Sequence, residues 1–166
     1  MFSPELLDLS ERLVDMARRR GWHITCAESC TGGLIAAAIT QIPGSSAVFD
    51  RGYVTYHNNA KVSLLGVDID SLKKYGAVSE AVARVMAEGA LATSGADLAL
   101  AATGIAGPGG GTEQKPVGLV YLAASWREGG DMIETLCERV QFSGDRGEIR
   151  LQAVGHVLAL GLKAGA

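Results

Sequence analysis

The chain has 166 residues, of which 48% are hydrophobic and 20% charged, and it carries a formal net charge of −3 at pH 7. This length fits a single domain over residues 1–166 with a sizeable core, and the composition excludes an intrinsically disordered chain. The slightly acidic balance argues against a nucleic-acid partner, because no basic face is available for a phosphate backbone.

The N-terminal segment is expected to form an amphipathic helix. Ser3 followed by Pro4 fits an N-cap with proline at the first helical position, and Gly21 would end the helix. The basic run 18–20 suits the negative end of the helix dipole; the alternative is a phosphate-binding patch. No apolar export segment precedes this helix, and no run reaches the ~20 apolar residues of a membrane span. We therefore expect no membrane partner and a cytoplasmic location.

Three cysteines, Cys26, Cys30 and Cys137, form an odd set, which fits free thiols in a reducing compartment. Cys26 and Cys30 are spaced as a ligand pair, but no second pair lies near them and the three histidines are scattered singly. We therefore expect no metal ion, and no other cofactor.

The remaining elements alternate between strands and helices. In the first half of the chain, the sequence predicts a strand over 22–27, a turn over 29–33, a helix over 34–39, a strand over 48–57 and a short helix capped by Asn58 and ending at Leu65. A helical turn over 71–75, a helix capped by Ser79 and ending near Gly95, a strand over 97–102 and a glycine-rich loop over 103–112 follow. The chain ends with strands over 117–126 and 132–142, joined by a turn around Gly129-Gly130, and a final helix with Asp145 and Glu148 as a capping box. This order indicates an α/β fold, a single-domain three-layer α/β/α sandwich, and the hairpin makes its sheet mixed.

The turn Glu28-Ser29-Cys30-Thr31-Gly32-Gly33 is the first candidate for chemistry, because ligands of open α/β sheets gather where strands end and helices begin. The backbone N–H groups of Cys30, Thr31, Gly32 and Gly33 would face the loop at a helix start. They would hold a phosphate, or an oxyanion formed beside a serine nucleophile. The structural alternative is that Ser29 only caps the helix.

The loop over 103–112 is the second candidate. It matches neither the phosphate loop that ends in Gly-Lys-Ser/Thr nor the dinucleotide fingerprint of three spaced glycines. It follows a buried strand and opens with Thr103-Gly104, which would bind the polar edge of a ligand. A surface turn without function explains the composition equally well.

A serine nucleophile needs a base, and none of the three histidines has an obviously suitable context. His23 begins a strand and His156 lies on the polar side of the last helix. His57 follows a strand and is the best of the three, although a surface position explains it as well. A lysine whose pKa is lowered by burial is the other known base, and Lys61 is the candidate. Taken alone, Lys61 would be interpreted as a solvated helix lysine.

Seven motifs occur together in one order. They are Ala27-Glu28-Ser29-Cys30-Thr31-Gly32-Gly33; Pro43-Gly44-Ser45-Ser46; Val54-Thr55-Tyr56 with Asn58 and Ala60-Lys61; Gly76-Ala77-Val78-Ser79-Glu80; Thr103-Gly104-Ile105-Ala106-Gly107-Pro108; Lys115-Pro116-Val117-Gly118; and Phe142-Ser143-Gly144-Asp145-Arg146. This set resembles, over nearly the whole chain, the C-terminal domain family of the competence/damage-inducible protein CinA, which includes stand-alone nicotinamide-nucleotide amidohydrolases of the PncC type.

The resemblance implies hydrolysis of the carboxamide of nicotinamide mononucleotide, a small-molecule nucleotide substrate, to nicotinate mononucleotide and ammonia in pyridine nucleotide salvage. It implies serine–lysine catalysis, which falls on Ser29 and Lys61, with Tyr56 relaying a proton or orienting the lysine. On the same basis Thr103, Gly104 and Arg146 are expected to bind the ribose phosphate.

Three positions depart from the family pattern. The family commonly has serine at His57, glutamate at Asn59 and aspartate at Gly109. None of these changes alters the expected nucleophile. His57 lies close in sequence to Tyr56 and Lys61, where it would either alter the proton relay or simply sit in solvent.

Two other interpretations stay open. One is a non-catalytic nucleotide-binding module that uses both glycine-rich loops. The other uses Cys30 as the nucleophile, because a helix start stabilises thiolates. The many small apolar residues are also compatible with a homo-oligomer.

Overall fold

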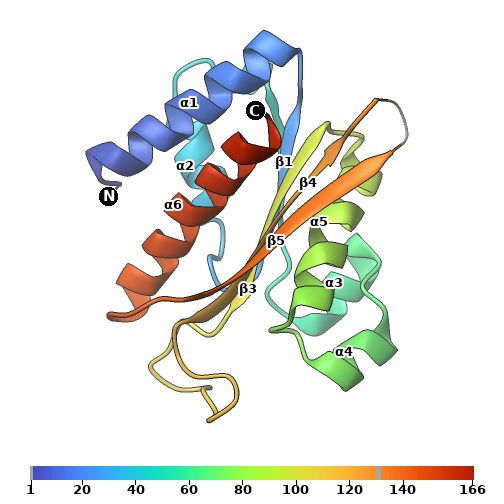
Figure 1. The fold of residues 1–166 in the computed structure, drawn as a ribbon, viewed down its shortest axis with the longest axis vertical. Coiled ribbons are helices and arrows are strands. Elements are labelled where there is room, and N and C mark those ends of the chain that lie inside the picture. The colour runs from blue at the N-terminus through green and yellow to red at the C-terminus, as the bar shows by residue number, and fades with distance from the viewer. Residues whose placement is uncertain (1, 130–131) are drawn as a thin grey trace.

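A five-stranded sheet forms the centre of the protein in a computed structural model that describes residues 2–129 and 132–166 (Figure 1). Its strand order is β2-β1-β3-β4-β5. Strand β1 pairs in parallel with both β2 and β3, whereas β4 is antiparallel to β3 and to β5. The strands are β1 (Ile24–Glu28), β2 (Phe49–Val54), β3 (Leu98–Gly104), β4 (Leu119–Arg127) and β5 (Ile133–Gln141). The expected mixed sheet is therefore confirmed.

Helices cover both faces of this sheet, so the three-layer sandwich is confirmed as well. They are α1 (Pro4–Arg20), α2 (Leu34–Thr40), α3 (Asn58–Leu65), α4 (Ile69–Tyr75), α5 (Glu80–Ser94) and α6 (Arg146–Ala164), with a short 3-10 helix at Ser45–Ala47. Helices α1, α2 and α6 lie on one face, and α3, α4 and α5 on the other (Figure 1). None of the described helices is long and apolar enough to cross a bilayer.

Local capping signals explain where most helices begin. The hydroxyl of Ser3 accepts the N–H of Leu6 at the start of α1, and Asp145 and Glu148 form the expected capping box of α6. Ser79 caps α5 in the same way. The expected cap of α3 is wrong by one residue, because the Nδ1 atom of His57, rather than a side-chain atom of Asn58, accepts an N–H of that helix, that of Asn59. Short-range hydrogen bonding therefore fixes these starts.

Several expected boundaries differ from the structure by a few residues, and two of these differences bear on the site. The strand predicted over 48–57 ends at Val54, because the chain turns there toward α3. Thr103 and Gly104 belong to β3 and not to the loop, since they pair with Tyr121 and Val120 of β4. The predicted β4–β5 hairpin is confirmed by its antiparallel register. Its expected turn includes Gly130, which lies outside the described residues.

The sheet separates two hydrophobic cores. Along β3, Leu98 and Leu100 face the core under α1, α2 and α6, while Ala99 and Ala101 face the core under α5. This alternation follows from the two-residue period of a strand. Because the β3 face toward α5 is built from alanines, that helix packs close to the sheet, which positions the loop that precedes it.

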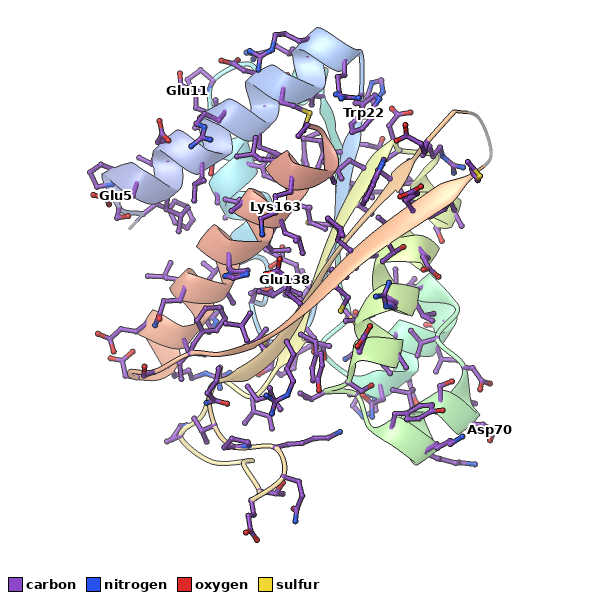
Figure 2. The ribbon with its side chains drawn as sticks, in the orientation of Figure 1. Glu5, Glu11, Trp22, Asp70, Glu138 and Lys163 are labelled. Carbon is purple, nitrogen blue, oxygen red and sulfur yellow. The ribbon has the colours of Figure 1, made fainter. Side chains whose placement is uncertain are left out.

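A polar cluster joins α6 to the edge strand β5. The carboxylate of Glu138 accepts a hydrogen bond from Lys163 at 2.9 Å and pairs with His156 at 2.5 Å (Figure 2). His156 is thus engaged on β5 rather than near Ser29.

Candidate active site

Parallel strand pairing brings the Ser29 turn beside the end of β2. Glu28, the last residue of β1, stands opposite Val54 of β2 and Ala102 of β3. The N–H of Thr55 donates to the Glu28 carbonyl at 2.8 Å, and the N–H of Ser29 donates to the Ala102 carbonyl at 2.9 Å. Carboxyl ends of parallel strands meet at one edge of a sheet, and Ser29 lies at this edge.

Lys61 reaches Ser29 from the first turns of α3. Its side chain is only 1% exposed, and its Nζ lies 3.1 Å from the Ser29 Oγ. The same ammonium donates to the backbone carbonyls of Thr55 at 2.7 Å and Tyr56 at 3.4 Å. None of the ion pairs found among the described residues includes Lys61. The lysine is therefore buried against neutral oxygens without a counter-ion.

Burial changes the pKa values of Lys61 and of the neighbouring Cys30. Desolvation lowers the pKa of Lys61, because a buried ammonium loses its hydration. Burial also raises the pKa of the neighbouring Cys30 thiol to about 11. A neutral lysine is a base, and a thiol with this pKa stays protonated near neutral pH. The electrostatics therefore favour Ser29 over Cys30 as the group activated by Lys61.

Two backbone N–H groups of the turn, those of Gly32 and Gly33, already donate hydrogen bonds within the protein. The N–H of Gly32 donates to the Ser29 carbonyl at 3.1 Å, and the N–H of Gly33 donates to the Glu28 carboxylate at 3.0 Å. The expectation that all four amides from Cys30 to Gly33 face a ligand is therefore wrong for the two glycines. The amides of Cys30 and Thr31 make no hydrogen bond to other described residues. Thr31 is fully buried, whereas Cys30 lines a cavity, so the Cys30 amide is the one that can receive an anion.

Glu28 explains why the helix start does not serve as an open anion site. Its side chain is fully buried, and its two oxygens accept the N–H groups of Gly33, Ile35 and Ala36, each at 3.0 Å. A carboxylate inside the protein thus neutralises the positive end of the α2 dipole. Glu28 belongs to the first sequence motif, but its pattern alone predicted no role for it. Its place at the end of an otherwise apolar strand was the available signal.

A cavity of about 220 Å³ opens beside the Ser29–Lys61 pair. Its lining includes most of the predicted site, together with several residues that the sequence analysis did not assign to a ligand. The lining residues are Ser29, Cys30, Tyr56, Asn58, Lys61, Ala77, Val78, Thr103, Gly104, Ala106 and Arg146. A second cavity of about 530 Å³ adjoins it and shares Ala106 and Arg146. The two loops singled out in the sequence therefore meet at one cavity.

Tyr56 and Arg146 form one wall of this cavity. The guanidinium of Arg146 donates to the Tyr56 hydroxyl at 2.8 Å and to the Gly107 carbonyl at 2.7 Å. The expected contact of Tyr56 with Lys61 is made by the tyrosine's carbonyl rather than by its hydroxyl. The geometry therefore favours the orienting role of Tyr56 over the proton relay.

Thr103 is held inside the wall. It is 1% exposed, and its hydroxyl donates to the Ala77 carbonyl at 2.9 Å, which fixes the loop before α5 against the strand. Gly104 follows it where the chain passes Val120 and Leu119 too closely for a Cβ atom. These two residues shape the cavity through backbone placement.

The structure leaves other predicted candidates outside the cavity lining. His57 is exposed and caps α3, and Asn59 and Gly109 are exposed as well. His23 lies at the other end of β1. Within residues 2–129 and 132–166, no three His, Cys, Asp or Glu side chains come together as a metal site.

Comparison with known proteins gives consistent matches over nearly the whole chain. Residues 6–164 match the family model described as the CinA C-terminal domain. The chain is 50% identical over 163 residues to the nicotinamide-nucleotide amidohydrolase PncC of Enterobacter agglomerans, covering 98% of this chain and 97% of that protein. It is 48% identical over 158 residues to PncC of Escherichia coli K12, covering 95% and 93%. The crystal structure of competence/damage inducible protein CihA from Agrobacterium tumefaciens superposes with a TM-score of 0.94 at 47% identity, covering 99% and 98%.

Proposed function

The chain belongs to the CinA C-terminal domain family, and from this premise we propose that it hydrolyses the carboxamide of nicotinamide mononucleotide through a Ser29 nucleophile and a Lys61 base. The activity class is that of its relatives of about 50% identity, which are nicotinamide-nucleotide amidohydrolases by name. The observation that carries the mechanism is the 3.1 Å contact between Lys61 Nζ and Ser29 Oγ in a desolvated site.

Acylation starts from neutral Lys61. The lysine takes the Ser29 proton while the hydroxyl oxygen attacks the carboxamide carbon, which forms a tetrahedral intermediate with a negative oxygen. The amide of Cys30 stabilises this oxyanion. The intermediate collapses when its C–N bond breaks, and protonated Lys61 delivers its proton to the departing nitrogen, which leaves as ammonia.

Deacylation reverses the roles of the same groups. Lys61, neutral again, takes a proton from a water molecule that attacks the Ser29 ester. The C–O bond to Ser29 then breaks, the serine recovers its proton from the lysine, and nicotinate mononucleotide is released. The net reaction consumes one water and yields one carboxylic acid and one ammonia, which exchange a proton in solution to give carboxylate and ammonium.

Substrate orientation follows from the two adjoining cavities. The smaller one, beside Ser29, is of a size for the pyridine carboxamide, with Thr103 and Gly104 in its wall. Arg146 stands between it and the larger one, where a planar guanidinium is suited to charge-assisted contacts with the ribose phosphate. We therefore place the reacting amide at Ser29 and the phosphate on the Arg146 side.

The test compares turnover with binding. Purified protein is assayed for ammonia release from nicotinamide mononucleotide, and the shift of its thermal unfolding midpoint is measured with the same nucleotide. Multiple turnovers support the amidohydrolase. A thermal shift without turnover at any pH between 6 and 10 would instead support a nucleotide-binding module.

A further inference from the structure

Arg150 on α6 binds the backbone of the Ser29 turn but does not line the cavity. Its Nε donates to the Cys30 carbonyl at 3.1 Å, and its Nη2 donates to the Thr31 carbonyl at 2.9 Å, across 120 positions of sequence. We propose that Arg150 is a positioning residue that orients the oxyanion-binding amide of Cys30. This inference rests on the proposed hydrolysis.

Peptide geometry links these carbonyl contacts to the amide of Cys30. In a planar trans peptide, the C=O and the following N–H point in opposite directions. A bond from Arg150 to the Cys30 carbonyl therefore directs the N–H of Thr31 away from α6. A bond to the Thr31 carbonyl fixes the next peptide, whose N–H belongs to Gly32 and donates to the Ser29 carbonyl. That last contact sets the Ser29–Cys30 peptide plane, and with it the N–H of Cys30.

Two side chains of opposite charge bind the backbone at the turn, one its N–H groups and the other its carbonyl groups. Glu28 binds amides from within the protein, at Gly33, Ile35 and Ala36. Arg150 binds the carbonyls from the α6 side, and none of the ion pairs found among the described residues includes it. The guanidinium is thus committed to backbone oxygens, where its planar fork matches two carbonyls in a way that a lysine cannot.

The absence of a side chain at Gly32 is consistent with the positioning role of Arg150. A Cβ atom at Gly32, where φ is +56°, would lie 3.2 Å from Arg150 Nη2. A glycine at this position therefore lets the guanidinium approach both carbonyls closely. The turn contributes the glycine to this contact, and α6 contributes the arginine.

A matched control exists at the opposite end of the sheet. Arg127 also donates to two backbone carbonyls, those of Ala96 at 3.2 Å and Leu91 at 3.5 Å, and it is half-buried like Arg150. It is the last residue of β4, at the end of that strand that is distant from Ser29. Substitutions at Arg127 therefore report the cost of losing an arginine that binds two carbonyls without an effect on the oxyanion site.

The experiment compares R150K and R150Q with R127K and R127Q in steady-state hydrolysis of nicotinamide mononucleotide, each below its own unfolding midpoint. Loss of one oxyanion donor costs ~10²- to 10³-fold in kcat, and a misplacement of about 1 Å can cost up to ~10²-fold. We therefore expect R150Q to lower kcat by about 10- to 100-fold with KM within about twofold. R150K should fall between R150Q and the wild type, whereas both Arg127 variants should keep kcat within about twofold.

A binding measurement separates positioning from general damage. The aldehyde analogue of nicotinamide mononucleotide forms a tetrahedral adduct with a serine, whereas nicotinate mononucleotide does not. R150Q should weaken binding of the aldehyde by the same factor as kcat and leave binding of nicotinate mononucleotide unchanged.

Three results would overturn the inference while leaving the proposed function intact: kcat of R150Q equal to that of R127Q, equal weakening of both ligands, or loss of folding in both Arg150 variants. If the wild type itself releases no ammonia, the proposed function fails, and this inference fails with it.

Discussion

The Nζ atom of Lys61 lies 3.1 Å from the Oγ atom of Ser29, although 32 positions separate the two residues in the chain. The pairing of β1 with β2 produces this contact, because it places Thr55 next to Glu28 and so sets the carbonyl that holds the lysine. Burial removes the hydration of the ammonium and favours its neutral form. The pair therefore has the arrangement of a hydroxyl and its base.

The pH dependence of turnover tests Lys61 as the base. Because the pKa of Lys61 is lowered, kcat/KM should rise with pH to a plateau, with an apparent pKa below the ordinary lysine value of ~10.4. Lys61→Arg should leave at most ~1% of kcat/KM at every pH, since the guanidinium stays protonated. Ammonia release between pH 6 and 10 provides the measurement. A flat profile, or an active Lys61→Arg variant, would exclude this role.

The same lowered pKa predicts how stability changes with pH. Between the folded and unfolded pKa values of Lys61, the unfolded chain binds more protons than the folded protein. The free energy of unfolding of the wild type, relative to Lys61→Met, should therefore rise with pH through that window and stay constant below it. Urea unfolding of both proteins at several pH values measures this difference, and a decrease with pH would contradict it.

Tyr56 and Arg146 should behave as a coupled pair. Both Tyr56→Phe and Arg146→Gln remove the 2.8 Å hydrogen bond between the tyrosine hydroxyl and the guanidinium. We expect the double variant to lose less kcat/KM than the product of the two single losses, with a coupling of about 0.5–3 kcal/mol. A double-mutant cycle on nicotinamide mononucleotide checks this. Fully multiplicative losses would mean that the two side chains act independently.

Glu28 should be required for stability. Glu28→Ala leaves three N–H groups without an acceptor, a buried one at Ile35 and part-buried ones at Gly33 and Ala36. A buried group costs about 1–3 kcal/mol, so we expect a loss of about 2 kcal/mol or more. The exposed Glu11 on α1 is the control, and Glu11→Ala should stay within about 0.5 kcal/mol of the wild type. Urea unfolding gives both values. Equal stabilities of the two variants would show that the Glu28 carboxylate does not hold α2.

Gly104 should not tolerate a side chain. A Cβ atom there would lie 2.6 Å from Val120 Cγ2 and 2.7 Å from the Leu119 carbonyl oxygen, so Gly104→Ala should cost about 1–3 kcal/mol. Gly109 has open space around it, and Gly109→Ala should change stability by less than about 0.5 kcal/mol. Thermal unfolding of the two variants compares them directly. An unchanged midpoint for Gly104→Ala would show that the strands shift freely.

Signals between close neighbours in the chain were predictable from the sequence. The N-caps at Ser3 and Ser79 and the capping box of Asp145 with Glu148 each depend on residues within one helical turn. The three-layer fold followed from the alternation of strands and helices. The cap at His57 was missed because Asn58 is the commoner capping residue, whereas an imidazole nitrogen can accept the same N–H.

Long-range features were not predictable from residue patterns alone. Lys61 has the local pattern of a solvated helix lysine, and only strand pairing buries it beside Ser29. The turn itself gave no indication that Glu28 would occupy the amides of α2 or that Arg150 would hold its carbonyls. The family resemblance supplied the Ser29–Lys61 expectation, and physical reasoning on the structure supplied the reason for it.

The central claim is that Ser29, activated by Lys61, is the nucleophile for the nucleotide carboxamide. The most direct test is ammonia release from nicotinamide mononucleotide by the wild type, Ser29→Ala and Cys30→Ala, assayed side by side after all three are shown to be folded. We expect Ser29→Ala to lose at least ~10⁴-fold in kcat and Cys30→Ala to stay within about tenfold of the wild type. Near-normal release by Ser29→Ala, or loss of activity confined to Cys30→Ala, would contradict the proposal.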